Sequence, residues 1–276
     1  MKELAITLNV CDQQLMAIIH QGRSSKTIAT AVLIIVGGPQ YRVGSHRQFI
    51  QLARYLANEG ITVMRFDYRG MGDSEAEKQH FDAICEDTKA AIDALFQQQP
   101  KIQKVVLWGL CDAASAALIY AHKDARVSGL VLLNPWLESE QAMAKTMVKY
   151  YYLQRLLSKR FWHKLITGKV NLAESSSEIK GFVKGCVGNE QRDESSYQVR
   201  MLNGLQAFDG KLCLILSGTD LTAREFDQQT NTNQAWQKLH QPYCEIRRLA
   251  AADHTFSSAK FKREVELITC KFVESC

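Results

Sequence analysis

The sequence lacks the long apolar runs of a membrane protein and the composition of a disordered chain. No stretch approaches the ~18 uninterrupted apolar residues that a membrane-spanning helix needs. Its first twenty residues do not form the apolar core of a signal peptide, because polar residues interrupt them at Asn9 and at 12–14. Hydrophobic residues make up 46% and charged residues 23% of the 276 residues, which excludes a disordered or fibrous chain. We therefore expect a folded cytoplasmic protein.

Closely spaced cysteine pairs are also missing. The eight cysteines lie at long, irregular intervals without a Cys-x-x-Cys pair, and several fall inside apolar patterns. This spacing matches neither the ligand spacing of a structural zinc site nor a disulfide framework. We expect reduced, mostly buried thiols and no metal.

Acidic residues are absent from one long segment, residues 141–170, which contains seven lysines and arginines. The whole chain has a formal net charge of +5, so the remainder has a net charge of −2 (5 minus 7). Because one segment carries the whole positive excess, the chain does not resemble a protein that coats nucleic acid. Within this segment, residues 150–162 predict an amphipathic basic helix with aromatic side chains. Such a helix can pack on the domain as a lid, which we favour, or contact an anionic membrane surface or an acidic substrate or carrier.

Buried-strand patterns and helical patterns alternate along the rest of the chain. This alternation predicts an α/β fold with a mostly parallel central sheet and helices on both of its faces. Ser45 and Gln48 have the spacing of a capping box at the start of the first helix. Strands are expected at 4–9, 14–21, 31–36, 61–66, 104–108, 127–134, 212–217 and 244–249, and helices at 45–59, 81–99, 112–122, 228–239 and 258–270.

The stretch 137–208 breaks this alternation. It is long, mainly helical in pattern, and lies between two predicted strands. We predict that it is an inserted helical cap, and that residues 1–136 and 209–276 form the core domain.

The strongest local signal for chemistry lies in residues 105–117. An apolar strand turns sharply into a helix of small residues, and Cys111 lies at the turn. This is the context of a nucleophile elbow, whose strained backbone needs small residues two positions before and two after, here Gly109 and Ala113. The N-terminus of the following helix would stabilise a thiolate. We predict that Cys111 is a catalytic nucleophile.

A nucleophile of this kind needs a base, and the base needs an orienting carboxylate. In elbow folds the acid and then the histidine follow the nucleophile, each on a loop after a later strand. Asp220 and His254 each follow a predicted strand in that order. Asp227 and Asp253 are rival acids. Asp227 lies too deep in the following segment, and Asp253, next to the histidine, cannot readily reach its ring.

Acyl chemistry also needs backbone N–H donors for a developing oxyanion. One donor is expected from Asp112, directly after the nucleophile. The other is expected from the glycine-rich loop after the first buried strand. In that loop Pro39 has no N–H, so Gly38 is the first candidate and Gln40 the second. Gln40 and Trp136 are the candidate substrate-binding residues.

A second specific string, residues 65–74, follows another buried strand and contains two glycines suited to a tight loop. Asp67 and Arg69 are expected to form an ion pair or hydrogen bonds within the loop. We interpret this string as scaffold near the site.

The order of these features resembles that of the α/β-hydrolase superfamily over nearly the whole chain. More narrowly, Gly-Gly-Pro-Gln-Tyr-Arg-Val-Gly-Ser-His-Arg at 37–47 and Gly-Leu-Cys-Asp-Ala-Ala-Ser at 109–115 resemble the hydrolase 1 group associated with the exosortase A system. Those bacterial proteins occur alongside exopolysaccharide biosynthesis and protein-sorting genes. The resemblance implies a cytoplasmic hydrolase that serves this pathway.

The chain departs from the superfamily pattern at two positions. Cysteine stands where serine is usual, and Ala113 stands where the second glycine is usual. Dienelactone hydrolases and polyhydroxyalkanoate synthases are similar in using an elbow cysteine. A thiolate attacks activated esters and thioesters, and the resulting thioester can pass its acyl group to water, an alcohol or an amine.

We therefore expect a cysteine-dependent esterase or thioesterase that uses Cys111, His254 and Asp220 on a small acyl substrate, with no cofactor. An acyltransferase with the same triad is the first alternative, and the basic segment is then a candidate contact for an acyl carrier. A non-catalytic binding scaffold is the second alternative, although all three triad positions hold competent residues.

Overall fold

The computed structural model describes residues 2–23, 28–138 and 196–276. The chain divides into two compact units, one of residues 1–137 and 197–276 and the other of residues 138–196. The fold below is that of the first unit. Most of the predicted cap, including the basic helix at 150–162, lies outside the described residues.

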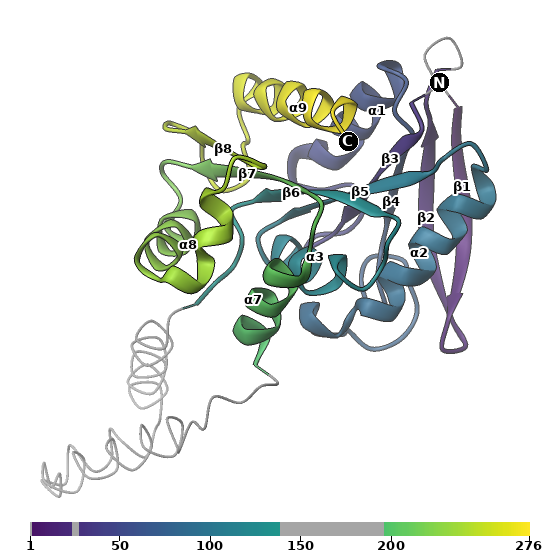
Figure 1. Cartoon of the computed structure of the whole chain (residues 1–276). Helices are drawn as coiled ribbons and strands as arrows, with labels where there is room; N and C mark the ends of the chain where they lie inside the picture. The colour runs from purple at the N-terminus through teal and green to yellow at the C-terminus, as the bar shows by residue number, and fades with distance from the viewer. Residues whose placement is uncertain (1, 24–27, 139–195) are drawn as a thin grey trace, which may run out of the picture. The chain divides into compact units, whose positions relative to one another are not determined.

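An eight-stranded sheet forms the centre of this unit (Figure 1). Its strand order is β1-β2-β4-β3-β5-β6-β7-β8. The first hairpin and the β2–β4 pair are antiparallel, and every later pair is parallel. The strands are β1 Lys2–Val10, β2 Gln13–Gln21, β3 Thr30–Ile35, β4 Val63–Phe66, β5 Lys104–Leu110, β6 Val127–Leu133, β7 Lys211–Ser217 and β8 Cys244–Leu249. The prediction of a mostly parallel sheet is confirmed.

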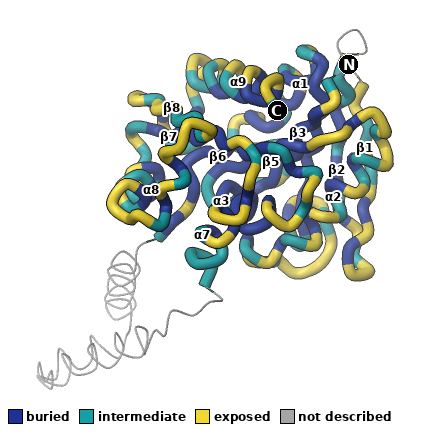
Figure 2. The backbone as a smooth tube through the Cα atoms, viewed as in Figure 1, coloured by how far each residue is buried: buried dark blue, intermediate teal, exposed yellow. Residues whose placement is uncertain are grey.

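The middle strands are apolar along their whole length because helices cover both faces of a parallel sheet. All six residues of β3 are buried, as are six of the seven in β5. In Figure 2 these strands are the dark-blue centre of the tube. Continuous apolar runs in the sequence therefore mark this part of the sheet.

Helices lie on both faces of the sheet, with α1 and α9 together on one side and α2 and α3 on the other (Figure 1). Helix α7 packs against α3, so it is part of the core, although the predicted cap ran to residue 208. The helices are α1 Gln48–Asn58, α2 Cys85–Gln98, α3 Asp112–Ala121, α7 Tyr197–Ala207, α8 Leu221–Thr232 and α9 Ala259–Glu274, with short 3-10 helices at Ser45–Arg47, Phe81–Ala83 and Gln234–His240.

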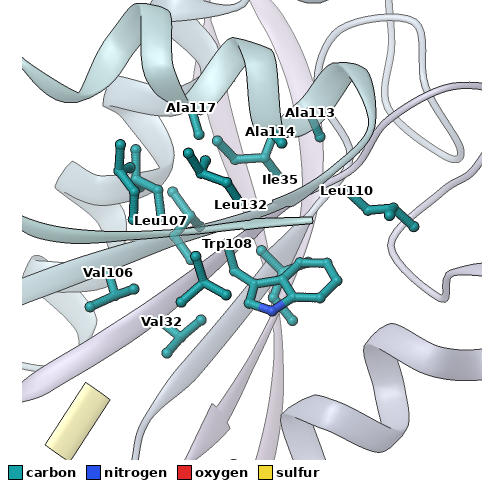
Figure 3. Close-up of a cluster of buried hydrophobic side chains, with 14 of the residues drawn as sticks. Val32, Ile35, Val106, Leu107, Trp108, Leu110, Ala113, Ala114, Ala117 and Leu132 are labelled. Carbon is teal, nitrogen blue, oxygen red and sulfur yellow. The ribbon is translucent and has the colours of Figure 1, made fainter. Parts of the chain in front are cut away.

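Close packing of α3 on the sheet places the turn that precedes it. In Figure 3 the small side chains of α3, Ala113, Ala114 and Ala117, lie on one side of β5, and Trp108 lies on the other. All three alanines are fully buried. On the opposite side Trp108 packs edge-on against Phe49 of α1, with ring centroids 5.5 Å apart. Small residues on α3 thus let the helix begin directly above the end of β5.

Two local predictions are wrong. The predicted capping box does not form, because no side chain caps α1 and its N-cap residue Arg47 has a left-handed backbone. The predicted helix at 228–239 is two elements: α8 begins earlier, at Leu221, and a 3-10 helix follows it. Asp220 caps α8 by accepting a hydrogen bond from the Ala223 N–H at 3.0 Å.

None of the helices in the described parts of the chain has both the length and the apolar character needed to cross a bilayer.

Candidate active site

Cys111 occupies a strained turn between β5 and α3. Its backbone has φ 62° and ψ −124°, a conformation that L-residues rarely adopt. The turn forces the chain so close to itself that a Cβ at Gly109 would lie 2.5 Å from the backbone carbon of Ala113. Only glycine fits at position 109, as the elbow geometry predicts. Strain of this kind is typical of functional sites.

Neighbouring strands hold the elbow in place. The Cys111 N–H donates to the carbonyl of Leu133 at 2.9 Å, and its carbonyl accepts from the N–H of Trp136 at 3.2 Å. The Ser115 hydroxyl then donates to the Trp136 carbonyl at 2.7 Å. The side chain of Cys111 remains partly exposed. The thiol is therefore fixed by its backbone and open to a reactant.

The predicted acid and histidine meet at the carboxyl edge of the sheet. His254 Nδ1 lies 2.9 Å from Asp220 Oδ2. The two groups form an ion pair when the ring is protonated. The Cys111 side chain interacts with the same histidine. Three residues far apart in the sequence thus form the predicted chain of nucleophile, base and acid.

The electrostatics of this group favour a charged imidazole. Hydrogen bonds with Asp220 and then with Cys111 raise the pKa of His254 to about 10, against the opposing effect of burial. The same histidine lowers the pKa of Asp220 although burial raises it. These interactions favour the protonated, positively charged form of the His254 ring.

A buried amide that the sequence patterns did not single out supports the histidine loop. Asn134, fully buried at the end of β6, donates to the Ser217 hydroxyl at 2.8 Å and to the His254 carbonyl at 3.0 Å. Its side-chain oxygen accepts from the Ser217 N–H at 2.8 Å. The signal available in the sequence was a polar residue that ends an otherwise apolar strand.

The loop after β3 carries the predicted oxyanion donors. Gly38 has a positive φ of 60° and donates its N–H to Asp112 Oδ2 at 2.9 Å. Gln40 has a different role, because its N–H donates to the Gly37 carbonyl at 3.3 Å and its side-chain oxygen accepts from Ser45. Gly38 is therefore the better placed of the two candidates.

Charged side chains from β4 and the loop after it clamp this loop at Arg42. The Arg42 N–H donates to Asp67 at 2.5 Å, and the Arg42 guanidinium also pairs with Asp67. On the other side, Arg65 donates to the Arg42 carbonyl. Both Asp67 and Arg65 are buried. Asp67 therefore pairs with Arg42, and Arg69 pairs instead with Asp87.

The rival acids make other contacts. Asp227 pairs with Arg248 at 2.7 Å on the surface of the domain. Asp253 accepts a hydrogen bond from the N–H of Ser257 at 2.7 Å. Asp220, not either rival, is the carboxylate that lies beside the His254 ring.

Three apolar side chains in the segments that carry the candidate site are exposed. Trp136, directly after the elbow-contacting strand β6, is 41% exposed, and Tyr41 in the loop after β3 is 45% exposed. Leu221, next to Asp220, is 77% exposed. These three residues form what we call the apolar rim. An acyl group entering the site would contact apolar surface.

A separate small cavity between α1 and α9 is not part of this site. Gln48, Trp108 and Phe256 are among its lining residues, which lie in the described ranges and do not include the triad. It has room for about one water molecule, which would satisfy the buried amide of Gln48. Within those ranges, no three histidine, cysteine, aspartate or glutamate side chains gather as they would around a metal ion.

Comparison of the sequence with known proteins gives partial matches to two curated relatives. A segment of 109 residues, 38% of this chain, is 25% identical to the polyketide transferase GrgF of Penicillium. A segment of 115 residues, also 38% of the chain, is 32% identical to the human protein ABHD12B. The chain spans only 37% and 29% of the lengths of these relatives.

Comparison of the structure with solved structures covers almost the whole chain. The Pyrococcus furiosus esterase Pf2001 has a TM-score of 0.67 at 18% identity, covering 99% of this chain and 91% of that one. The structure of GrgF has a TM-score of 0.65 at 16% identity, covering 100% of this chain and 99% of that one. At these identities the likeness establishes the fold alone.

A family model covers more of the sequence than the curated relatives do. The model described as serine aminopeptidase, S33, matches residues 28–206, which is more than half of the chain. The matched region includes the glycine-rich loop after β3, Arg42 and the turn at Cys111. The chain therefore belongs to the serine aminopeptidase S33 family of α/β hydrolases.

Proposed function

We propose that this α/β hydrolase is a cysteine-nucleophile enzyme that cleaves ester or thioester bonds through an acyl-enzyme intermediate. The observation that carries the proposal is the position of Cys111, on a strained elbow and beside His254, whose ring lies 2.9 Å from Asp220. Its family is named for serine, but a cysteine at the elbow can act as the nucleophile in the same geometry.

In the first half of the reaction the Cys111 thiolate attacks the acyl carbonyl carbon. A carbon–sulfur bond forms, and the carbonyl π electrons move to the oxygen, which becomes an oxyanion facing backbone N–H donors. When the oxyanion collapses, the bond to the leaving alcohol or thiol breaks. The leaving group takes the proton of the His254 imidazolium, and Asp220 keeps the ring in the required tautomer.

In the second half, neutral His254 removes a proton from water, which attacks the thioester carbonyl. The new oxyanion collapses, the carbon–sulfur bond breaks, and the acid product leaves. Thiolate and imidazolium are restored. General-base and oxyanion contributions of this kind are each worth on the order of 10²–10⁴-fold in rate.

Acyl transfer with the same triad is the second candidate. One curated relative is named a polyketide transferase, and the apolar rim of Tyr41, Trp136 and Leu221 would suit a carbon-chain acyl group. Transfer differs from hydrolysis only in the second half, where an alcohol or amine replaces water as the attacking group.

The biological setting is a further part of this proposal. The motifs at 37–47 and 109–115 support membership of the exosortase A system-associated hydrolase 1 group, and with it a cytoplasmic role beside exopolysaccharide metabolism. The seven basic residues of 141–170 support a contact with a phosphate-bearing acyl carrier or an anionic membrane surface, while a lid role remains the simpler interpretation.

Intact-mass spectrometry with a panel of activated esters and thioesters tests the proposed function. The wild-type protein should gain the mass of one acyl group, and the Cys111→Ala variant should not. Cys85→Ala is the matched control, because Cys85 is a partly exposed thiol outside the triad. The reactions are repeated with alcohol and amine acceptors, so that an ester or amide product identifies transfer. An adduct that survives Cys111→Ala, or no adduct with any donor, would overturn the proposal.

A further inference from the structure

The carboxyl side chain of Asp112 lies where the oxyanion of an acyl substrate is expected. Its Oδ2 accepts the Gly38 N–H at 2.9 Å. The backbone N–H groups of Ala113 and of Asp112 itself also stabilise the ionised carboxyl group. Gly38 is one of the two donors that the sequence predicts for the oxyanion hole. A carboxyl side chain of the protein already accepts its N–H.

The position of this carboxyl group depends on Gly37. A Cβ at Gly37 would lie 2.1 Å from Asp112 Oδ1, so any side chain there would displace the carboxyl group. The Asp112 carboxyl group therefore lies in a site formed by Gly37, Gly38 and the start of α3, which we call the seat. It is built for a carboxyl group or for an oxyanion of similar size.

The carboxyl group is incompletely satisfied in this seat. Its Oδ1 is buried and has no hydrogen-bond partner among the described residues. Burial raises the pKa of Asp112, while the charge of Lys78 opposes this shift. Tyr68 also interacts with this carboxyl group, because its pKa is raised by burial and then by the Asp112 charge. The Gly38 N–H therefore holds one oxygen of the carboxyl group, and within the described parts of the chain the other oxygen has no hydrogen-bond partner.

An acyl substrate cannot use the Gly38 N–H while the Asp112 carboxylate accepts it. The oxyanion of a tetrahedral intermediate would place a second negative charge beside that carboxylate. We propose that the Asp112 side chain fills the oxyanion hole of the resting enzyme and limits acylation of Cys111 until the acyl oxygen displaces it. This inference rests on the proposed function of Cys111. It adds a role for the Asp112 side chain, whereas the sequence predicts a role only for the Asp112 backbone N–H.

Two substitutions test whether the Asp112 carboxyl group blocks the oxyanion hole or only supports the structure around it. Asp112→Ala removes the carboxyl group and keeps the backbone donor. Asp112→Asn keeps the shape but removes the charge, so it competes less strongly with an oxyanion. Asp209→Asn is the matched charge control, because the Asp209 side chain is fully exposed.

Each variant is assayed in two reactions of the same sulfur atom. The burst of p-nitrophenol from p-nitrophenyl acetate measures acylation, which forms an oxyanion. Alkylation by iodoacetamide forms none. The ratio of the two rates cancels any change in the reactivity of the thiolate and reports the oxyanion hole alone.

The proposal expects the acylation-to-alkylation ratio to rise about tenfold in Asp112→Ala, the size expected for losing one competing charge-assisted hydrogen bond. The rise should be smaller in Asp112→Asn, and the control should match the wild type. A ratio that stays constant or falls in both variants would overturn the inference. If Asp112→Ala does not fold, the isosteric variant decides alone. If no protein is acylated although Cys111 is alkylated, the proposed function fails instead.

Discussion

Asp220 should control both the charge of His254 and the reactivity of Cys111. Asp220→Asn removes the carboxylate whose hydrogen bond is the largest cause of the raised His254 pKa. The asparagine oxygen can still accept the Ala223 N–H that caps α8, so the fold should be kept. The substitution therefore tests the charge of Asp220 rather than its structural contact.

The expected size follows from the shift itself. The His254 pKa lies at about 10 rather than at its ordinary 6.5, a difference that would correspond to at most about 5 kcal/mol. The His254 side chain is 36% exposed, and Cys111 shares the effect, so solvent screening reduces the part due to Asp220 to about 2 kcal/mol. The ratio of protonated to neutral His254 should therefore fall about 30-fold at a given pH.

Two measurements check this expectation. In the nuclear magnetic resonance spectrum, the titration of the His254 ring should move from about pH 10 towards its ordinary value of 6.5. The rate of iodoacetamide alkylation of Cys111 at pH 7 should fall about 30-fold, and turnover should fall by about 100-fold or more because the ring tautomer is also lost.

A second carboxylate, on helix α8, supplies the control variant. Asp227→Asn removes a carboxylate from α8 that pairs with Arg248 and does not reach the histidine, so the titration and both rates should stay at wild-type values. If Asp220→Asn leaves the His254 titration unchanged and keeps full turnover, Asp220 is not the orienting acid.

Three further predictions concern the structure that supports the site. Gly109→Ala should destabilise the fold by about 2 kcal/mol or more, because its Cβ would lie 2.5 Å from the Ala113 backbone; an unchanged denaturation midpoint would contradict this. Asn134→Ala should cost about 2–4 kcal/mol in the free energy of unfolding and lower turnover, since it strands the buried Ser217 N–H and frees the His254 loop; wild-type stability in urea denaturation would refute it. The raised pKa of His254 adds stability that is complete below about pH 6.5 and is lost as the pH rises through about 10. The free energy of unfolding should therefore decline across that window, and the decline should be smaller in Asp220→Asn.

The local sequence patterns predicted best the strands that are buried on both faces. The strands β3, β5 and β6 are covered on both faces, so their apolar runs identify them directly. The elbow could be found for a related reason, because the sharp turn from an apolar strand into a helix of small residues leaves few alternatives. Once the order of strands was known, Asp220 and His254 followed from their places after β7 and β8.

Contacts between distant residues could not be predicted in this way. Asp67 pairs with Arg42 across 25 positions, although the nearer Arg69 looked equally suitable. The start of α8 was missed because Asp220 is both the helix cap and the proposed acid, and Leu221 after it is exposed, which hides the helical apolar pattern. The contact between Gly38 and the Asp112 carboxyl group joins residues 74 positions apart and has no local signature.

The position of the acyl group during turnover tests the central claim most directly. The wild-type protein is mixed with an activated thioester, quenched in acid within the first turnover, digested and mapped by tandem mass spectrometry. The account predicts that the acyl mass lies on the peptide containing Cys111, at close to one group per chain, and that it disappears as product forms. An acyl group found on another residue, or turnover without any acylated Cys111, would contradict it.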